Sequence, residues 1–104
     1  VPATSLLGIA ALCAFIWIGY AGFQDRTYEA FIDAGNGAFG RRNYDYAARM
    51  YTQALQEAER LDPRGRKVSQ TLRALSLTYK AMGREDLAAD YLERAREIRA
   101  ARRR

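Results

Sequence analysis

Charge is distributed very unevenly along this chain of 104 residues, and the partition constrains the fold more than any other sequence feature. All 17 Lys and Arg residues and all 12 Asp and Glu residues lie between Asp25 and Arg104, whereas residues 1–24 carry no charge. The sequence therefore predicts two parts. Residues 1–24 form an uncharged segment, and residues 25–104 form a charged domain that ends in a basic tail.

The uncharged segment has the length and composition of a transmembrane helix. Leu6–Phe23 contains neither a charged residue nor proline, and as a helix it would measure about 27 Å. With Val1–Ser5 added, the stretch is long enough to cross a hydrocarbon core about 30 Å thick, where a single segment must satisfy its own backbone hydrogen bonds as a helix. A cleaved signal peptide would need a basic residue before the apolar stretch, and none is present. A helix buried in a protein core is normally shorter than this segment.

Side chains of this segment form two groups of candidate contacts. Aromatic residues gather at its C-terminal end, where an aromatic belt meets the membrane interface. Small residues share one helical face and would let another helix approach closely, although glycine and alanine are also common in transmembrane helices in general. The interface candidates are Trp17, Tyr20, Phe23 and Arg26, and the helix-packing candidates are Gly8, Ala11, Phe15, Gly19 and Gly22.

Positive charge follows the segment and does not precede it. Arg26, Arg41 and Arg42 come after it, whereas residues 1–24 contain no Lys or Arg. Under the positive-inside rule, this asymmetry places the charged domain on the cytoplasmic side of the membrane, or on the matrix side in a mitochondrion. We therefore expect a single-pass membrane protein whose folded domain faces that compartment.

The composition excludes several classes of active site. The chain has no histidine and one cysteine, Cys13, so a structural zinc site lacks its ligands and a catalytic triad that depends on histidine cannot form. Carboxylates such as Glu57 and Glu85 have no nucleophile or base beside them for general acid–base catalysis. We expect no enzyme activity, no cofactor, no metal and no small-molecule substrate.

The charged domain shows the 3.6-residue periodicity of amphipathic helices in four segments. One such stripe runs through Leu72, Leu75, Tyr79 and Met82. Glycine, proline and capping residues separate the segments, and short loops make successive helices antiparallel neighbours. The expected helices cover residues 27–40, 44–61, 66–82 and 86–101. The predicted fold is therefore all-α.

The four segments contain two copies of one pattern. Aligning Ala47 with Ala88 gives a period of 41 residues. The pattern resembles the tetratricopeptide repeat, a helix-turn-helix unit of about 34 residues. The matching residues are Phe31, Gly35, Ala47, Tyr51 and Ala54 in the first unit and Leu75, Tyr79, Gly83, Ala88 and Ala95 in the second. Two departures are Ser76, which stands where the family has glycine, and Pro63, which comes one turn late.

The resemblance covers residues 27–101 and implies a two-repeat helical stack that contacts other proteins. In this family, ligands often lie against the first helix of each repeat. The corresponding contact candidates here are Glu29, Ile32, Asn36, Phe39, Gln70, Arg73, Leu77 and Lys80. The family's clamp for a peptide carboxylate would need a basic residue in place of Ile32 and a third repeat, and an ordinary solvated face is the other interpretation of these positions.

The ends of such a short stack differ in polarity. Stacked repeats usually need about three units to bury a continuous core. The last segment carries many charges, but the first has Tyr28, Phe31, Ile32 and Phe39 with no matching polar face. We expect that first helix to pack on another protein or near the membrane.

The basic tail is open to more than one interpretation. Arg99 and Arg102–Arg104 are ordinary solubilising residues at a helix end, where cations complement the helix dipole, or they contact anionic lipid headgroups or an acidic partner. No recognition motif for nucleic acid accompanies them.

Together these features predict a non-catalytic accessory or scaffold subunit of a larger membrane complex, in contact with other subunits and with the lipid bilayer. The alternative is a membrane-tethered receptor or co-chaperone that recruits a soluble client peptide.

Overall fold

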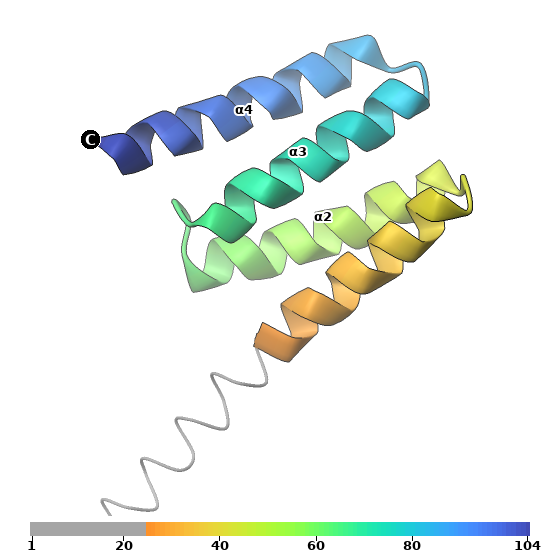
Figure 1. Cartoon of the computed structure of the whole chain (residues 1–104), viewed down its shortest axis with the longest axis horizontal. Helices are drawn as coiled ribbons and strands as arrows, with labels where there is room; N and C mark the ends of the chain where they lie inside the picture. The colour runs from red at the N-terminus through yellow and green to blue at the C-terminus, as the bar shows by residue number, and fades with distance from the viewer. Residues whose placement is uncertain (1–24) are drawn as a thin grey trace, which may run out of the picture.

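Residues 25–104 are the part of the chain that the computed structural model describes, and they form four helices joined by short loops (Figure 1). The helices are the leading helix (residues 25–40), α2 (Tyr44–Leu61), α3 (Arg66–Ala81) and α4 (Glu85–Arg103). No strand occurs among residues 25–104. The all-α prediction for this domain is confirmed, and each predicted helix limit agrees with the structure to within two residues.

The predicted transmembrane helix lies outside the described residues, together with its interface and packing candidates other than Arg26. Among the four described helices, none is both long enough and apolar enough to span a membrane.

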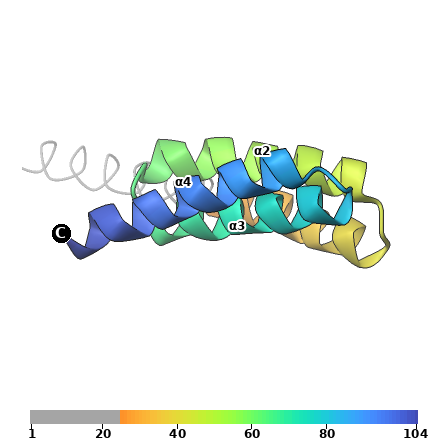
Figure 2. The same cartoon turned by 90° about the horizontal axis from the view of Figure 1, so that it is seen from above.

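The helices stack in antiparallel order, with α3 in contact with both α2 and α4 (Figure 1). The leading helix and α3 form one layer, α2 lies in the other, and α4 crosses α3 obliquely (Figure 2). One end of the stack, here called the proximal end, collects the first turn of the leading helix, the loop at 62–65 and the C-terminal end of α4. The opposite, distal end carries the loops at 41–43 and 82–84.

The two distal loops have the same backbone geometry, 41 residues apart. Arg42 has a φ of 63° and Gly83 a φ of 79°, the only positive φ values in the described chain. In each loop the next backbone N–H donates to a carbonyl five residues earlier, from Asn43 to Ala38 and from Arg84 to Tyr79, both at 2.8 Å. This is the pattern of a left-handed helix C-cap. The loops therefore confirm the repeat period.

Small residues lie where the helices of each repeat cross. Ala47, Ala54 and Ala95 are fully buried, and Ala88 is 5% exposed. Side chains of this size let helix axes approach to about 8 Å. At the glycine position of the second unit, the Ser76 hydroxyl donates to the Ala88 carbonyl of α4 at 2.6 Å. The serine thus fits this position by making a hydrogen bond across the helix pair.

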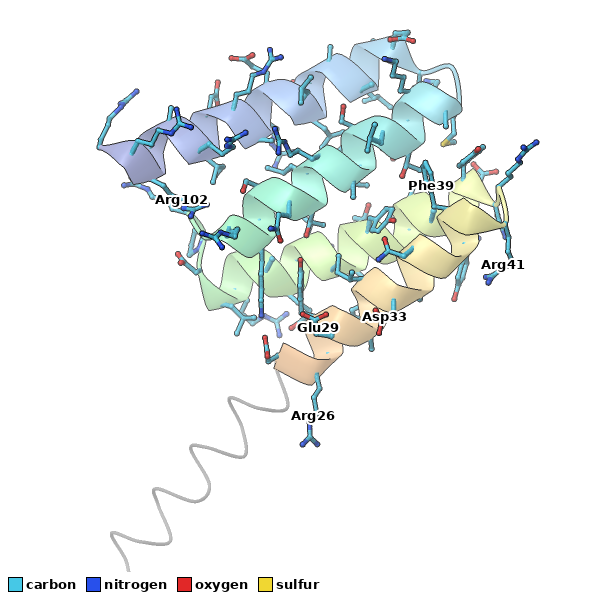
Figure 3. All side chains as sticks on the ribbon, in the orientation of Figure 1. Arg26, Glu29, Asp33, Phe39, Arg41 and Arg102 are labelled. Atoms are coloured by element: carbon cyan, nitrogen blue, oxygen red, sulfur yellow. The ribbon has the colours of Figure 1, made fainter. Side chains whose placement is uncertain are left out.

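The apolar face of the leading helix is partly covered by the rest of the stack. Tyr28 is 4% exposed, and Phe31, Ile32 and Phe39 pack against the buried core. The stack therefore supplies part of the cover for this face, since Thr71 of α3 bonds to Tyr28 and Tyr44 of α2 packs on Phe39. The expected contact of this helix with another protein or with the membrane stays a prediction, because Phe31, Ile32 and Phe39 remain only partly buried. The outward surface carries Arg26, Glu29 and Asp33, all exposed (Figure 3).

Candidate protein-binding surface

The solvent-facing side of α3 carries four of the eight predicted contact residues. Gln70, Arg73, Leu77 and Lys80 are all exposed, and they recur at the spacing of one helical face. The opposite side of the same helix is core, including Val68, Leu72 and Leu75. We call the four exposed residues the α3 contact face.

The exposure of Leu77 on this face is not explained if the face only contacts solvent. Its side chain is 61% exposed, the highest value for a large hydrophobic residue among residues 25–104. Arg73 and Lys80 lie one turn to either side of it on the same helix. The face therefore offers an apolar centre between two cations on a rigid helix.

Two of the four candidates on the leading helix have contacts within the domain. Asn36 accepts a hydrogen bond through Oδ1 from the Tyr51 hydroxyl at 2.5 Å, and the Phe39 ring packs edge-on against Tyr44 with centroids 5.3 Å apart. Ile32 is half-buried and Glu29 is exposed. No hydrogen bond or ion pair joins these residues to the α3 contact face in the described structure.

A basic groove lies between α3 and the C-terminal part of α4, at the proximal end. It has a volume of about 390 Å³. Its lining residues, which we call the arginine groove, are Arg66, Ser69, Gln70 and Arg73 of α3 and Arg99, Arg102 and Arg103 of α4. Figure 3 labels Arg102 near the end of α4. Gln70 and Arg73 thus belong both to the predicted contact residues and to this groove.

The arginine groove contains no compensating negative charge. None of its five arginines has a carboxylate within 4.0 Å among the described residues, whereas Arg94 and Arg96 on the other faces of α4 pair with Glu59 and Glu93. Sequence reasoning left the last arginines open between a solubilising helix end and a contact with lipid or an acidic partner, and it missed the groove that they form with α3. The spacing of Arg99, Arg102 and Arg103 already matched one face of a helix continued beyond Ala101.

A second groove on the other side of the same helix pair is lined differently. It has a volume of about 510 Å³, and Val68, Leu72 and Ile98 form an apolar floor. Its rim carries both signs of charge, including the Arg94–Glu59 pair. The two sides of the α3–α4 pair therefore differ in chemistry. The charged side chains of one groove are all cationic, whereas the other groove has an apolar floor and a rim of mixed charge.

A cluster at the proximal end fastens the leading helix to α3. Asp25 forms an ion pair with Lys67, whose ammonium also lies 4.9 Å from the centre of the Tyr28 ring. The Tyr28 hydroxyl and the Thr71 hydroxyl are 3.0 Å apart and share a hydrogen bond. Burial raises the pKa of Tyr28, and the bond to Thr71 opposes that rise in part. These groups are structural, and the described residues contain no group of three or more His, Cys, Asp or Glu side chains suited to a metal.

The repeated loops, the buried alanines and the 41-residue period all describe helix-turn-helix repeats. The sequence model of the family described as "Tetratricopeptide repeat" matches residues 27–101. The chain belongs to the tetratricopeptide-repeat family. The match covers the same residues as the resemblance in the sequence, and a tetratricopeptide-repeat domain is in general a module for protein–protein contacts. No curated protein and no solved structure matches this tetratricopeptide-repeat chain.

Proposed function

We propose that this tetratricopeptide-repeat domain binds a protein partner through the α3 contact face, as a non-catalytic scaffold subunit of a membrane complex to which residues 1–24 anchor it. The exposure of Leu77 between Arg73 and Lys80 carries the proposal. An apolar contact at the centre of a polar rim is the usual plan of a protein interface. The partner that fits is an apolar side chain flanked by carboxylates.

The rigidity of α3 favours this face over the loops as a binding surface. α3 is packed on both sides by α2 and α4. Binding to a surface that is already ordered costs little conformational entropy. The leading helix adds Glu29 and the exposed part of Ile32 to the same layer, so a longer partner segment can extend onto it.

The membrane part of the proposal is supported by the uncharged character of residues 1–24 and by the way the domain begins. Asp25, the first charged residue, is already fixed to α3 through Lys67. The described domain therefore contacts α3 from its first residue onward. The positive-inside rule favours a cytoplasmic or matrix location for the domain.

Leu77→Asp tests the α3 contact face directly. The full chain is extracted from its native membranes in mild detergent, and the amount of each co-purifying protein is compared between variants. Leu77→Asp is expected to lower partner recovery about tenfold or more, as loss of a buried apolar contact does. The thermal unfolding midpoint should change little, because exposed substitutions alter stability by about 0.5 kcal/mol.

Leu61→Asp is the matched control, since Leu61 is the other clearly exposed leucine of the described domain, at 37%, and lies at the end of α2. It should leave recovery unchanged. Full recovery with Leu77→Asp would contradict the proposed face. If the Leu77→Asp preparation loses an integral membrane protein, the role as a complex subunit is supported. If it loses a soluble protein, the alternative of a client receptor is supported.

The membrane anchor has a test of its own. Release of the wild-type chain from membranes by alkaline carbonate would refute the anchor.

A further inference from the structure

We propose that the arginine groove binds the phosphate groups of anionic phospholipids and holds the proximal end of the stack on the membrane surface. The inference deepens the proposed function and rests on its membrane anchor. Five guanidinium groups converge on one groove with no carboxylate among the lining residues. A planar guanidinium matches a phosphate with two parallel hydrogen bonds, which makes arginine the preferred side chain for such a ligand.

The lining of the groove favours a phosphate over other acidic ligands. Besides the arginines, only Ser69 and Gln70 line it. No aromatic ring is present on which a nucleic-acid base would stack, and no apolar pocket is present to anchor a peptide side chain. At about 390 Å³ the groove has room for a headgroup rather than for an extended polymer.

The position of the groove favours a lipid as the source of that phosphate. Arg66 immediately precedes Lys67, and Lys67 holds Asp25, the residue that follows the uncharged segment. The C-terminal end of α4, which brings Arg99, Arg102 and Arg103, lies at the same proximal end (Figure 1). A basic cluster beside a membrane anchor is attracted to the anionic lipids of the cytoplasmic leaflet.

The groove and the α3 contact face share Gln70 and Arg73 but differ along the rest of α3. The groove uses the first half of the helix, up to Arg73, whereas Leu77 and Lys80 lie toward the distal end. A headgroup in the groove therefore leaves the apolar centre of the α3 contact face open to a protein partner.

Arginine footprinting tests the proposal on the full chain. The protein is placed in nanodiscs of phosphatidylcholine alone or of phosphatidylcholine with phosphatidylglycerol, treated with phenylglyoxal, and the modified arginines are quantified by mass spectrometry. We expect all five arginines of the groove, including Arg66 and Arg73, to be protected several-fold only in the anionic discs. Arg41 and Arg42, which are exposed at the distal end, provide an internal control and should react equally in both.

A double variant and a soluble anion distinguish the groove from general attraction. Arg99→Glu with Arg102→Glu should abolish the protection of Arg66 and Arg73. Equal modification in both disc types would overturn the proposal, and so would equal protection of Arg41 and Arg42. Protection by millimolar inorganic phosphate in neutral discs, with no further effect of anionic lipid, would also overturn it, since the ligand would then be free phosphate.

Failure of the anchor is seen separately. If residues 1–24 do not insert, the chain will not co-elute with neutral discs, which refutes the anchor of the proposed function. The groove is then tested by flotation with vesicles of the same two compositions. The groove is supported if the wild-type chain floats with anionic vesicles in a salt-sensitive way and the double variant does not. It is overturned if both proteins float equally or if neither floats.

Discussion

Replacing Gly35 by alanine is expected to destabilise the domain, although alanine is the better helix former. Gly35 lies in the leading helix, directly against the ring of Tyr51 from α2. A Cβ at Gly35 would lie 2.6 Å from Cε1 and 2.7 Å from Cδ1 of that ring, well inside van der Waals contact. The ring has little freedom to move, because Tyr51 is 4% exposed and its hydroxyl is bonded to Asn36.

The magnitude follows from three opposing contributions. Alanine gains about 1 kcal/mol over glycine inside a helix. Overpacking a filled site costs about 1–3 kcal/mol, and displacement of the ring weakens a hydrogen bond worth about 1 kcal/mol. The net loss is about 1–3 kcal/mol, which in a domain of this size lowers the melting temperature by about 4–8 °C for each kcal/mol.

Thermal unfolding of the full chain, followed by far-ultraviolet circular dichroism, measures this loss. Gly37→Ala is the matched control on the same helix, because its Cβ would meet only the flexible end of Arg41 at 3.3 Å. That variant should be more stable than wild type by up to about 1 kcal/mol. The two substitutions are thus expected to have opposite signs, and a Gly35→Ala variant as stable as wild type would refute the reasoning.

A second substitution checks the cause of the loss. The second repeat has Ser76 and Leu92 at the positions that correspond to Gly35 and Tyr51, so a larger residue on the first helix accompanies a smaller one on the second. Tyr51→Leu should therefore cost less in the Gly35→Ala background than in wild type. Purely additive losses would show that the two sites do not interact.

Other predictions follow from the loops, the helix crossings and the buried tyrosines. Arg42→Gly should stabilise the domain by about 1 kcal/mol in urea unfolding, because a left-handed conformation strains a residue that has a Cβ; no gain would contradict that strain. Ala95→Leu should destabilise it by about 1–3 kcal/mol in the same assay, since Ala95 is fully buried where helices cross, whereas Ala100→Leu on the exposed side should not. Burial raises the pKa of three tyrosine hydroxyls above the ordinary value for this side chain. The folded state therefore retains these protons longer than the unfolded state, so the melting temperature should fall as the pH rises above about 10; a flat profile through that range would count against their burial. The three are Tyr28, Tyr51 and Tyr91.

Helix limits in this domain were predictable because the signals that set them are local. Asparagine is a typical N-cap residue, and the Asn43 side chain accepts a hydrogen bond from the Tyr46 backbone N–H at the start of α2. Glycine typically follows a helix end, and Gly83 after α3 adopts a positive φ. Small residues mark close helix crossings, and the alanines of the second helix of each repeat are buried there. Each of these signals depends on a few neighbouring residues.

Features that depend on contacts between distant segments of the chain could not be predicted from the sequence in this way. Arg42 carries no sign of its left-handed conformation, which becomes understandable only from its equivalence to Gly83. The apolar stripe of the leading helix looked unpartnered because the sequence does not show that α3 packs beside it. The arginine groove depends on how far α4 extends and on which turn of α3 it reaches, and neither follows from composition.

The cluster that fastens the leading helix to α3 also links the start of the described domain to the helix that presents the contact face. Lys67 pairs with Asp25 and Thr71 bonds to Tyr28, across sequence separations of 42 and 43 residues. These two contacts reach consecutive turns of α3 and do not involve α2. Since α3 also carries the exposed Leu77, the orientation of the contact face relative to the leading helix is set by contacts between segments that are distant in the sequence.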